Sequence, residues 1–218
     1  VAGKKLSIPL LPASRTDDSY TVEQYHSDVG VSRVATGVKI NNASVKIDPD
    51  AIATVEFGMM GKDMTSSASP YFTTPAAASV TGVLTGNAGE LYVDGVQAAV
   101  ITTFSFDLDG NMEAGKVVGN LLPDGTRPAA NIFIGRIAAK GEFSAYFNDD
   151  TLFTKFRDEV PITLVFRFNG EGNQAFSVKF PKCKLGGSTL DDKEVGGLIQ
   201  SIPFTALLPD GSSSVLEQ

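Results

Sequence analysis

Apolar and polar residues alternate with a period of two along much of this chain. The alternation is clearest in three stretches, with apolar residues at Phe104, Phe106 and Leu108, at Ile162, Leu164, Phe166 and Phe168, and at Phe176, Val178 and Phe180. Successive side chains of a β-strand point to opposite faces, so each stretch predicts a strand with one buried face. We therefore expect an all-β protein, folded as a β-sandwich or barrel.

The same pattern, with the turn residues between its stretches, predicts about ten strands. They lie at residues 20–25, 34–40, 44–47, 53–59, 91–93, 98–108, 132–147, 162–168, 174–184 and 198–207. Asn41 and Asn42 predict a turn between the second and third of these strands, and Asp94-Gly95 predicts a tight hairpin turn. Residues 112–129 lack the pattern and are expected to be irregular.

One short α-helix is expected between the strands at 132–147 and 162–168. Asp149 or Asp150 can cap its N-terminus, and Pro161 lies just beyond its end. Its apolar stripe consists of Leu152, Phe153 and Phe156. No linker is evident between any of these elements, so residues 1–218 are expected to form a single domain.

Three segments fall outside the strand pattern. Residues 1–18 are expected to form an extended N-terminal arm, and residues 209–218 a C-terminal tail. Residues 61–82 are rich in Ser, Thr, Ala and Pro and predict a long loop. Loops of about 20 residues are uncommon in compact domains and are usually functional. The adjacent aromatic residues Tyr71 and Phe72 in this loop need a covering surface, either on this chain or on another.

Charge and composition argue against several classes of protein. The 18 Lys and Arg residues against 25 Asp and Glu give a net charge of −7, whereas a protein that grips nucleic acid needs clustered cations on the phosphates. A single Cys cannot form an internal disulfide. No apolar run approaches the roughly 18–20 residues of a membrane span, and no signal-peptide pattern is present. We expect a soluble protein that folds in the cytoplasm, with no membrane partner.

No stretch carries a convincing catalytic, metal or cofactor signature. Residues 58–62 are two residues short of a phosphate-binding loop, and residues 107–113 lack the helices and final Glu of a calcium loop. His26 has no partner at zinc-ligand spacing, and Cys183 is most simply an inward apolar residue. The acidic residues at 191–194 are expected in a solvated loop, the alternative being a hydrolase carboxylate pair. We therefore expect no enzymatic activity, no metal and no cofactor.

The order of several short motifs is similar to that of a known family. The motifs are Ser14-Arg-Thr-Asp17, Tyr20-Thr-Val-Glu-Gln24, Thr54-Val-Glu-Phe57, Met60-Gly-Lys-Asp-Met64, Tyr71-Phe-Thr-Thr-Pro75, Lys184-Leu-Gly-Gly187 and Ile202-Pro-Phe204. With them, nearly the whole chain resembles the major tail tube proteins of bacteriophages with long non-contractile tails. The inner tubes of contractile tails and of type VI secretion systems share that fold.

The resemblance implies a structural subunit of the virion tail, assembled in the host cytoplasm. Such subunits form homo-hexameric rings that stack into a hollow conduit for genome ejection. Four strands of each copy line a continuous 24-stranded barrel, the helix packs outside the sheets, and a long loop reaches the next ring. The implied partners are a tape-measure protein, tail terminator or baseplate proteins, and double-stranded DNA that passes without sequence-specific contacts.

Within this resemblance, individual residues have expected places. The candidates for contacts between copies are Lys62, Asp63, Tyr71, Phe72, Arg15 and Asp17, together with the arm and the tail. The candidates for the lumen are Thr54, Glu56, Ser105 and Asp107. We also expect the sheets of one copy to be left incomplete, so that neighbours complete the wall. The alternative is a carbohydrate- or receptor-binding β-sandwich module, which the absence of Trp weakens.

Overall fold

The computed structural model describes residues 7–9, 18–77, 84–86, 89–115, 117–119, 125, 128–147, 150–169, 175–191, 197–209 and 214–217. These residues form fifteen strands and one helix. The elements are β1 (Ser7–Pro9), β2 (Tyr20–His26), β3 (Val31–Ile47), β4 (Thr54–Met60), β5 (Asp63–Ser67), β6 (Gly89–Val93), β7 (Val96–Asp109), β8 (Glu113–Gly115), β9 (Asn131–Phe133), β10 (Ala138–Tyr146), α1 (Thr151–Arg157), β11 (Ile162–Asn169), β12 (Ala175–Leu185), β13 (Thr189–Asp191), β14 (Ile199–Ala206) and β15 (Ser214–Glu217).

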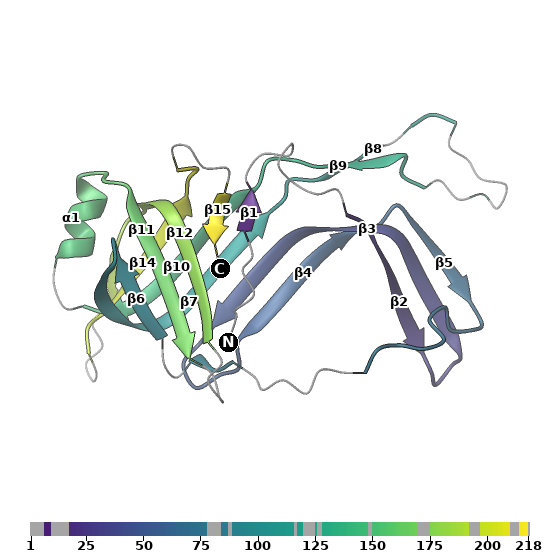
Figure 1. Cartoon of the computed structure of the whole chain (residues 1–218), viewed down its shortest axis with the longest axis horizontal. Coiled ribbons are helices and arrows are strands. Elements are labelled where there is room, and N and C mark those ends of the chain that lie inside the picture. The colour runs from purple at the N-terminus through teal and green to yellow at the C-terminus, as the bar shows by residue number, and fades with distance from the viewer. Residues whose placement is uncertain are drawn as a thin grey trace.

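Six of the strands close on themselves within one copy, in the order β6–β7–β10–β14–β12–β11 and back to β6. We call this circuit the barrel (Figure 1). It confirms the expected all-β fold with one short helix. The barrel closes because the second half of β14 pairs with β12, with Thr205 opposite Lys184. The sheet that extends from it through β3 ends at β4, which pairs only with β3 among the described residues, so completion of the wall by neighbours stays a prediction.

The barrel is filled by phenylalanine side chains. Phe166 lies at the centre with no exposed surface, and its ring centroid is 4.0 Å from that of Phe104. The rings of Phe143, Phe204 and Phe180 follow at 5.6, 5.8 and 6.2 Å. Offset and edge-to-face aromatic contacts at these separations add to the free energy gained by burying the rings. The alternating apolar positions of the sequence therefore form one core.

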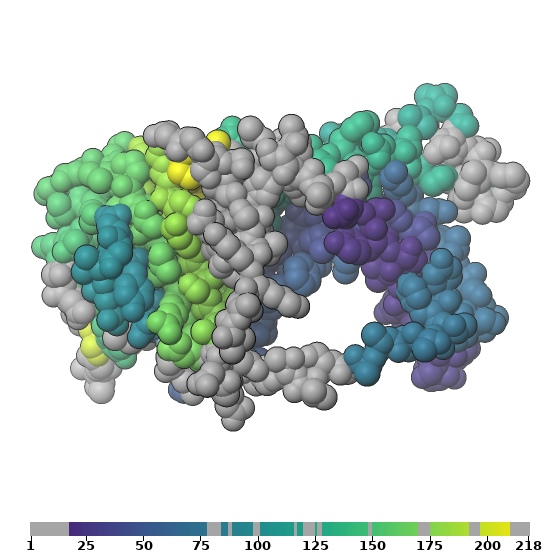
Figure 2. All heavy atoms as spheres, in the orientation of Figure 1, coloured from purple at the N-terminus to yellow at the C-terminus, as the bar shows by residue number. Residues whose placement is uncertain are grey.

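The longest strand, β3, belongs both to the barrel side and to a projecting sheet. Residues 42–47 pair with β7, whereas residues 31–38 pair with β2 on one side and β5 on the other. We call β2, β5 and residues 31–38 the blade. Figure 2 shows the purple and blue segments of the blade standing apart from the green strands of the barrel.

A turn at Asn41 and Asn42 was expected, but both residues belong to β3 and the strand continues beyond them. The pairing of β3 with β4 shifts between Ile40 and Asn42, so Asn41 forms a bulge. Its backbone carbonyl accepts a hydrogen bond from the Gly110 amide, at 2.6 Å, and its side-chain oxygen accepts one from the Met112 amide, at 2.9 Å. These bonds stabilise the bulge, so Asn41 and Asn42 lie in a strand although asparagine favours turns.

Three further expectations about loops and strands were wrong. Within 61–82, β5 is a strand that pairs with β3, and within 112–129, β8 pairs with β9. The expected strand at 132–147 is divided into β9 and β10. The β8–β9 pair is fixed to β3 because the buried Lys39 ammonium donates to the carbonyl of Ile132, at 3.0 Å.

The described parts of the chain ends lie against the barrel. β1 pairs with β15, with Ser7 opposite Glu217, and β15 pairs with β12 through Lys179. These short stretches of the expected arm and tail therefore extend the chain's own sheet. Arg15 and Asp17 lie outside the described residues.

The hairpin turn and the helix were predicted correctly and contact each other. Asp94 and Gly95 have φ angles of 52° and 83°, the positive values that a tight two-residue hairpin turn requires. Asp150 occupies the N-cap position without a side-chain hydrogen bond, and Asp149 lies outside the described residues. The Lys155 ammonium lies 2.6 Å from the Asp94 carboxylate, which links α1 to the turn.

Replacing Phe166 with Ala should lower the free energy of unfolding by about 3–5 kcal/mol, because the cavity would lie among four other rings. Chemical denaturation of the dispersed subunit measures the loss. The matched control is Phe153→Ala on the exposed side of α1, which should cost about 1 kcal/mol or less. Equal losses in the two variants would contradict this description of the core.

Candidate assembly surfaces

One face of the sheet formed by β4, β3, β7, β10 and β14 is polar. Residues directly opposite one another on neighbouring strands share a face of the sheet. One row across it contains Glu56, Ser44, Asp107, Lys140 and Thr205, and the next contains Thr54, Lys46, Ser105, Glu142 and Pro203. The four lumen candidates, which come from β4 and β7, therefore lie together on this polar face.

Carboxylates outnumber ammonium groups on the polar face. Within the described parts of these five strands, the exposed charges of the face are four carboxylates, of Glu56, Asp107, Asp109 and Glu142, and two ammonium groups, of Lys46 and Lys140. Lys39 also lies on this face of β3 but is buried. Lys46 lies 2.7 Å from the Asp48 carboxylate just beyond the end of β3. Ser44 and Ser201 donate hydrogen bonds to Asp107 and Glu142. The face is exposed and slightly acidic, and its described residues form no cluster of cations.

The opposite face of β4 is apolar and uncovered. Val55, Phe57 and Met59 have 52%, 52% and 53% of their surface exposed, whereas Val45 and Ile47, on the same face of β3, are buried. We call the three β4 residues the edge row. In the described part of the chain β4 pairs only with β3, so its second edge is also free. An open edge beside an apolar row is a template for pairing with another chain.

A carboxylate on the blade fixes the backbone that carries Tyr71 and Phe72. Glu23 Oε1 accepts hydrogen bonds from the Ser32 hydroxyl, at 2.5 Å, and from the Tyr71 amide, at 2.7 Å. Its Oε2 accepts one from the Phe72 amide, at 2.9 Å. The two rings stand edge to face with centroids 5.0 Å apart, and 58% and 44% of these residues is exposed. We call these two residues the aromatic pair.

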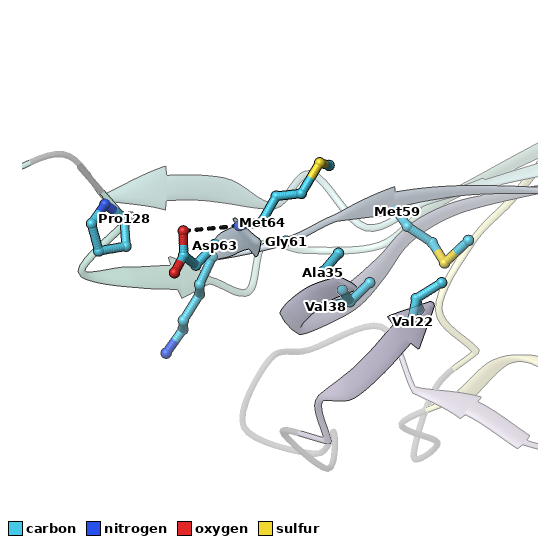
Figure 3. A pocket seen from close by; sticks show the side chains of 9 residues that line it. Val22, Ala35, Val38, Met59, Gly61, Asp63, Met64 and Pro128 are labelled. Carbon is cyan, nitrogen blue, oxygen red and sulfur yellow. Dashed lines mark hydrogen bonds between the residues drawn. The ribbon is translucent and has the colours of Figure 1, made fainter. Parts of the chain in front are cut away.

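A groove lies where the blade meets β4 (Figure 3). Its volume is about 420 Å³, and its lining is mostly apolar. Val22, Ala35, Val38, Met59 and Met64 provide the apolar surface, and Gly61, Lys62, Asp63 and Pro128 complete the lining. Two of the expected contact residues, Lys62 and Asp63, therefore border this groove.

Lys62 is held against the blade by its backbone. Its amide donates to the Thr36 carbonyl, and its own carbonyl accepts from the Ala129 amide, both at 3.0 Å. Gly37 has a φ of 61°, and a Cβ atom there would come within 2.9 Å of the Lys62 side chain. The aliphatic part of Lys62 thus covers a glycine that the bulged strand requires.

The described residues contain no group of three or more His, Cys, Asp or Glu side chains that could hold a metal ion. Residues 58–62 and 107–113 lie at strand ends and turns. Cys183 is buried in the core, and burial raises the pKa of its thiol to about 12, so it is almost entirely protonated at neutral pH. Asp191 ends β13, and the rest of the acidic group, 192–194, falls outside the described residues. Among the described helices, none is long and apolar enough to span a bilayer.

Glu23 is a functional candidate that inspection of the sequence did not single out. It lies in an expected strand and looks like an ordinary outward-facing residue. The amides that it binds are 48 and 49 positions further along the chain. No local spacing could have connected them.

Hydrogen bonds hold the pKa of Glu23 below the ordinary value for glutamate. The bond from the Ser32 hydroxyl has the largest effect, and those from the Tyr71 and Phe72 amides have smaller ones. These bonds should therefore be intact above the ordinary pKa of about 4.3 and be lost as pH falls through the lower, folded-state value. The amide proton shifts of Tyr71 and Phe72, measured by NMR on the dispersed subunit, should titrate with that low midpoint. Glu23→Gln should abolish the step. A midpoint at the ordinary value, or a step that survives the substitution, would contradict the assignment.

Comparison with known proteins places this sequence in a family. The sequence model of the family described as phage tail tube protein matches residues 8–206. Among solved structures, the chain is similar to the SPP1 tail tube determined by solid-state NMR and cryo-EM, with 12% identity over 76% of this chain and 72% of that chain. The TM-score is 0.28, too low to bear on the fold. No curated protein matches the chain. The family match covers most of the sequence and is to a structural family, not an enzyme family: the chain belongs to the phage tail tube protein family.

Proposed function

We propose that copies of this chain form hexameric rings that stack into the hollow conduit through which the phage genome leaves the capsid. Membership of the family makes the chain a structural component of a phage tail. The observation that supports a ring is the edge of β4 that has no partner among the described residues. β4 is polar on one face and bears the uncovered edge row on the other. A neighbouring copy at this edge would satisfy the unpaired backbone groups and cover the apolar side chains together.

The wall of the proposed tube consists of β4, β3, β7 and β10. These four strands are consecutive neighbours, and beyond them β14 turns into the closed barrel through its pairing with β12. Six copies, each contributing these four strands, would supply the 24 strands of the wall. Each copy would keep its own closed core, since β10 stays paired with β14. The helix α1 then lies outside the wall.

In this arrangement the polar face lines the lumen, with Thr54, Glu56, Ser105 and Asp107 in contact with water. Duplex DNA binds tightly where clustered cations release its counterions. On the polar face each exposed lysine has a carboxylate close by: Lys46 lies against Asp48, and Lys140 is opposite Asp107 in the sheet. A hydrated face of this kind lets DNA pass without holding it at many phosphates.

Contacts between successive rings are assigned to the aromatic pair, with Lys62 and Asp63 at the border of the groove. Aromatic side chains dominate the binding energy of many interfaces, and the Glu23 carboxylate already fixes their backbone. Arg15 and Asp17, in the N-terminal arm, and the C-terminal tail are further contact candidates.

The proposed partners follow from this role. They are further copies of the chain, a tape-measure protein inside the tube, and tail terminator or baseplate proteins at its ends. The subunit acts as a single domain, without membrane, metal or cofactor. It is made in the host cytoplasm and resides in the virion tail.

Purified protein, alone or with its tape-measure and initiator partners, should form rings or tubes visible by negative-stain electron microscopy. The free β4 edge and the edge row provide the driving force for this association. Material that stays monomeric under all of these conditions would count against the proposal.

Phe72→Asp should block stacking while leaving the subunit folded. It places a charge on the exposed aromatic pair, outside the barrel core, so the free energy of unfolding should change by about 0.5 kcal/mol or less. Circular dichroism reports the fold, and sedimentation with microscopy reports the tubes. Val96→Asp, at the exposed start of β7, is the matched control and should leave tubes intact. Normal tubes from Phe72→Asp would remove the aromatic pair from the interface.

A further inference from the structure

We infer that the groove between the blade and β4 receives the aromatic pair of a second copy of this chain. The inference rests on the proposed tube and identifies the surface that Tyr71 and Phe72 contact in it. No other part of the described chain covers either surface: Met64 in the groove and Tyr71 in the pair are 64% and 58% exposed.

The pair and the groove lie on opposite faces of the same three-stranded sheet. Val22 and Glu23 are consecutive residues of β2, so their side chains point to opposite faces. Val22 lines the groove with Ala35 and Met64, its partners across the sheet. Glu23 holds the aromatic pair on the other face. The sheet therefore separates the pair from the groove of its own copy.

A projection on one face and a matching hollow on the other generate a head-to-tail contact. Each copy then binds one neighbour through its aromatic pair and another neighbour through its groove. After one contact forms, the other surface is still available for a further copy. Contacts between unlike surfaces of this kind produce rings or open filaments, whereas contacts of a surface with itself stop at a dimer. The arrangement suits a subunit that adds copies along a tube.

The chemistry of the two surfaces agrees. The groove offers aliphatic side chains and the thioethers of Met59 and Met64, which adapt their shape and make favourable contacts with aromatic rings. Met59 also belongs to the edge row, so the groove is continuous with the β4 edge that is proposed to meet a neighbour. The Lys62 and Asp63 side chains at its border could form hydrogen bonds with the Tyr71 hydroxyl of the second copy.

The size of the contact explains why dispersed subunits need not associate through it. An aromatic side chain buries about 150–250 Å². Two of them fall well below the roughly 1,200–2,000 Å² of a stable interface. One pair in one groove is therefore weak alone and acts only when many copies are aligned.

Thiol cross-linking tests the contact directly in the full-length chain. Thr73→Cys places a thiol beside the aromatic pair without removing either ring, and Met64→Cys places one in the groove. With a short thiol-specific cross-linker under tube-forming conditions, the double variant should give a ladder of covalent oligomers. A mixture of the two single variants should give dimers only, and each single variant alone should give none. The buried Cys183 should not react.

The possible outcomes distinguish failure of this inference from failure of the proposed function. Cross-linking of Thr73→Cys with itself would mean that aromatic pairs meet each other, which overturns the inference. Tubes that form normally but never cross-link would mean that another part of the neighbour fills the groove, which overturns the inference and leaves the proposed function standing. Wild-type protein that forms no tubes overturns both.

A charge in the groove provides a second measurement that does not depend on thiol geometry. Met64→Lys should raise the protein concentration needed for tube formation about tenfold or more, as loss of an interface anchor does. It should do so without changing the unfolding midpoint, because Met64 is mostly exposed. Val96→Lys, a charge at an equally exposed apolar site away from the blade, is the control. An unchanged threshold for Met64→Lys would contradict the inference.

Discussion

The pairing of β3 with β7 is the interaction on which the rest of the structure depends. Residues 42–47 of β3 are held against the closed barrel by this pairing. The remainder of β3 is thereby projected outward, and it carries β2, β4 and β5 with it. The free edge of β4, the part of the polar face on β3 and β4, and the blade all exist because β3 is longer than the barrel needs. Without it, the barrel would be a self-contained domain.

The molecule therefore separates folding from assembly. The phenylalanine core is completed within one copy, so the subunit does not need its neighbours to bury its main apolar surface. The exposed apolar surfaces proposed for assembly are small. They are the edge row of β4, the aromatic pair and the groove beside the blade. In the proposed tube each of these contacts is small, so association would become strong only when several engage at once. A subunit that must be made in quantity before it polymerises benefits from this division.

The local pattern of the sequence was sufficient to predict the parts of the fold that depend on burial. The alternation around Phe104 and Phe106 predicted β7, and Asp94-Gly95 predicted its hairpin turn, because both signals lie within a few residues. Alternation places Thr54 with Glu56 on one face of their strand, and Ser105 with Asp107 on one face of theirs. That the two strands share this face follows only from their pairing with β3 in the structure.

Features that depend on distant partners could not be predicted. Asn41 belongs to a bulge that is held by residues about 70 positions away, and β5 is a polar strand recognisable only by its pairing with β3. The Glu23 carboxylate acts on amides that follow β5. The closing of the barrel rests on three residue pairs between β12 and β14, which no local pattern marks.

The central claim is that β4, β3, β7 and β10 form the inner wall of a tube and that the phenylalanine core of the barrel lies outside this wall. Cryo-electron microscopy of assembled tubes, at a resolution that traces side chains, tests this most directly. The account predicts that Glu56 and Asp107 face the lumen and that the edge row of β4 is covered by the adjacent copy. A map in which the polar face points away from the lumen, or in which the β4 edge stays exposed to solvent, would contradict it.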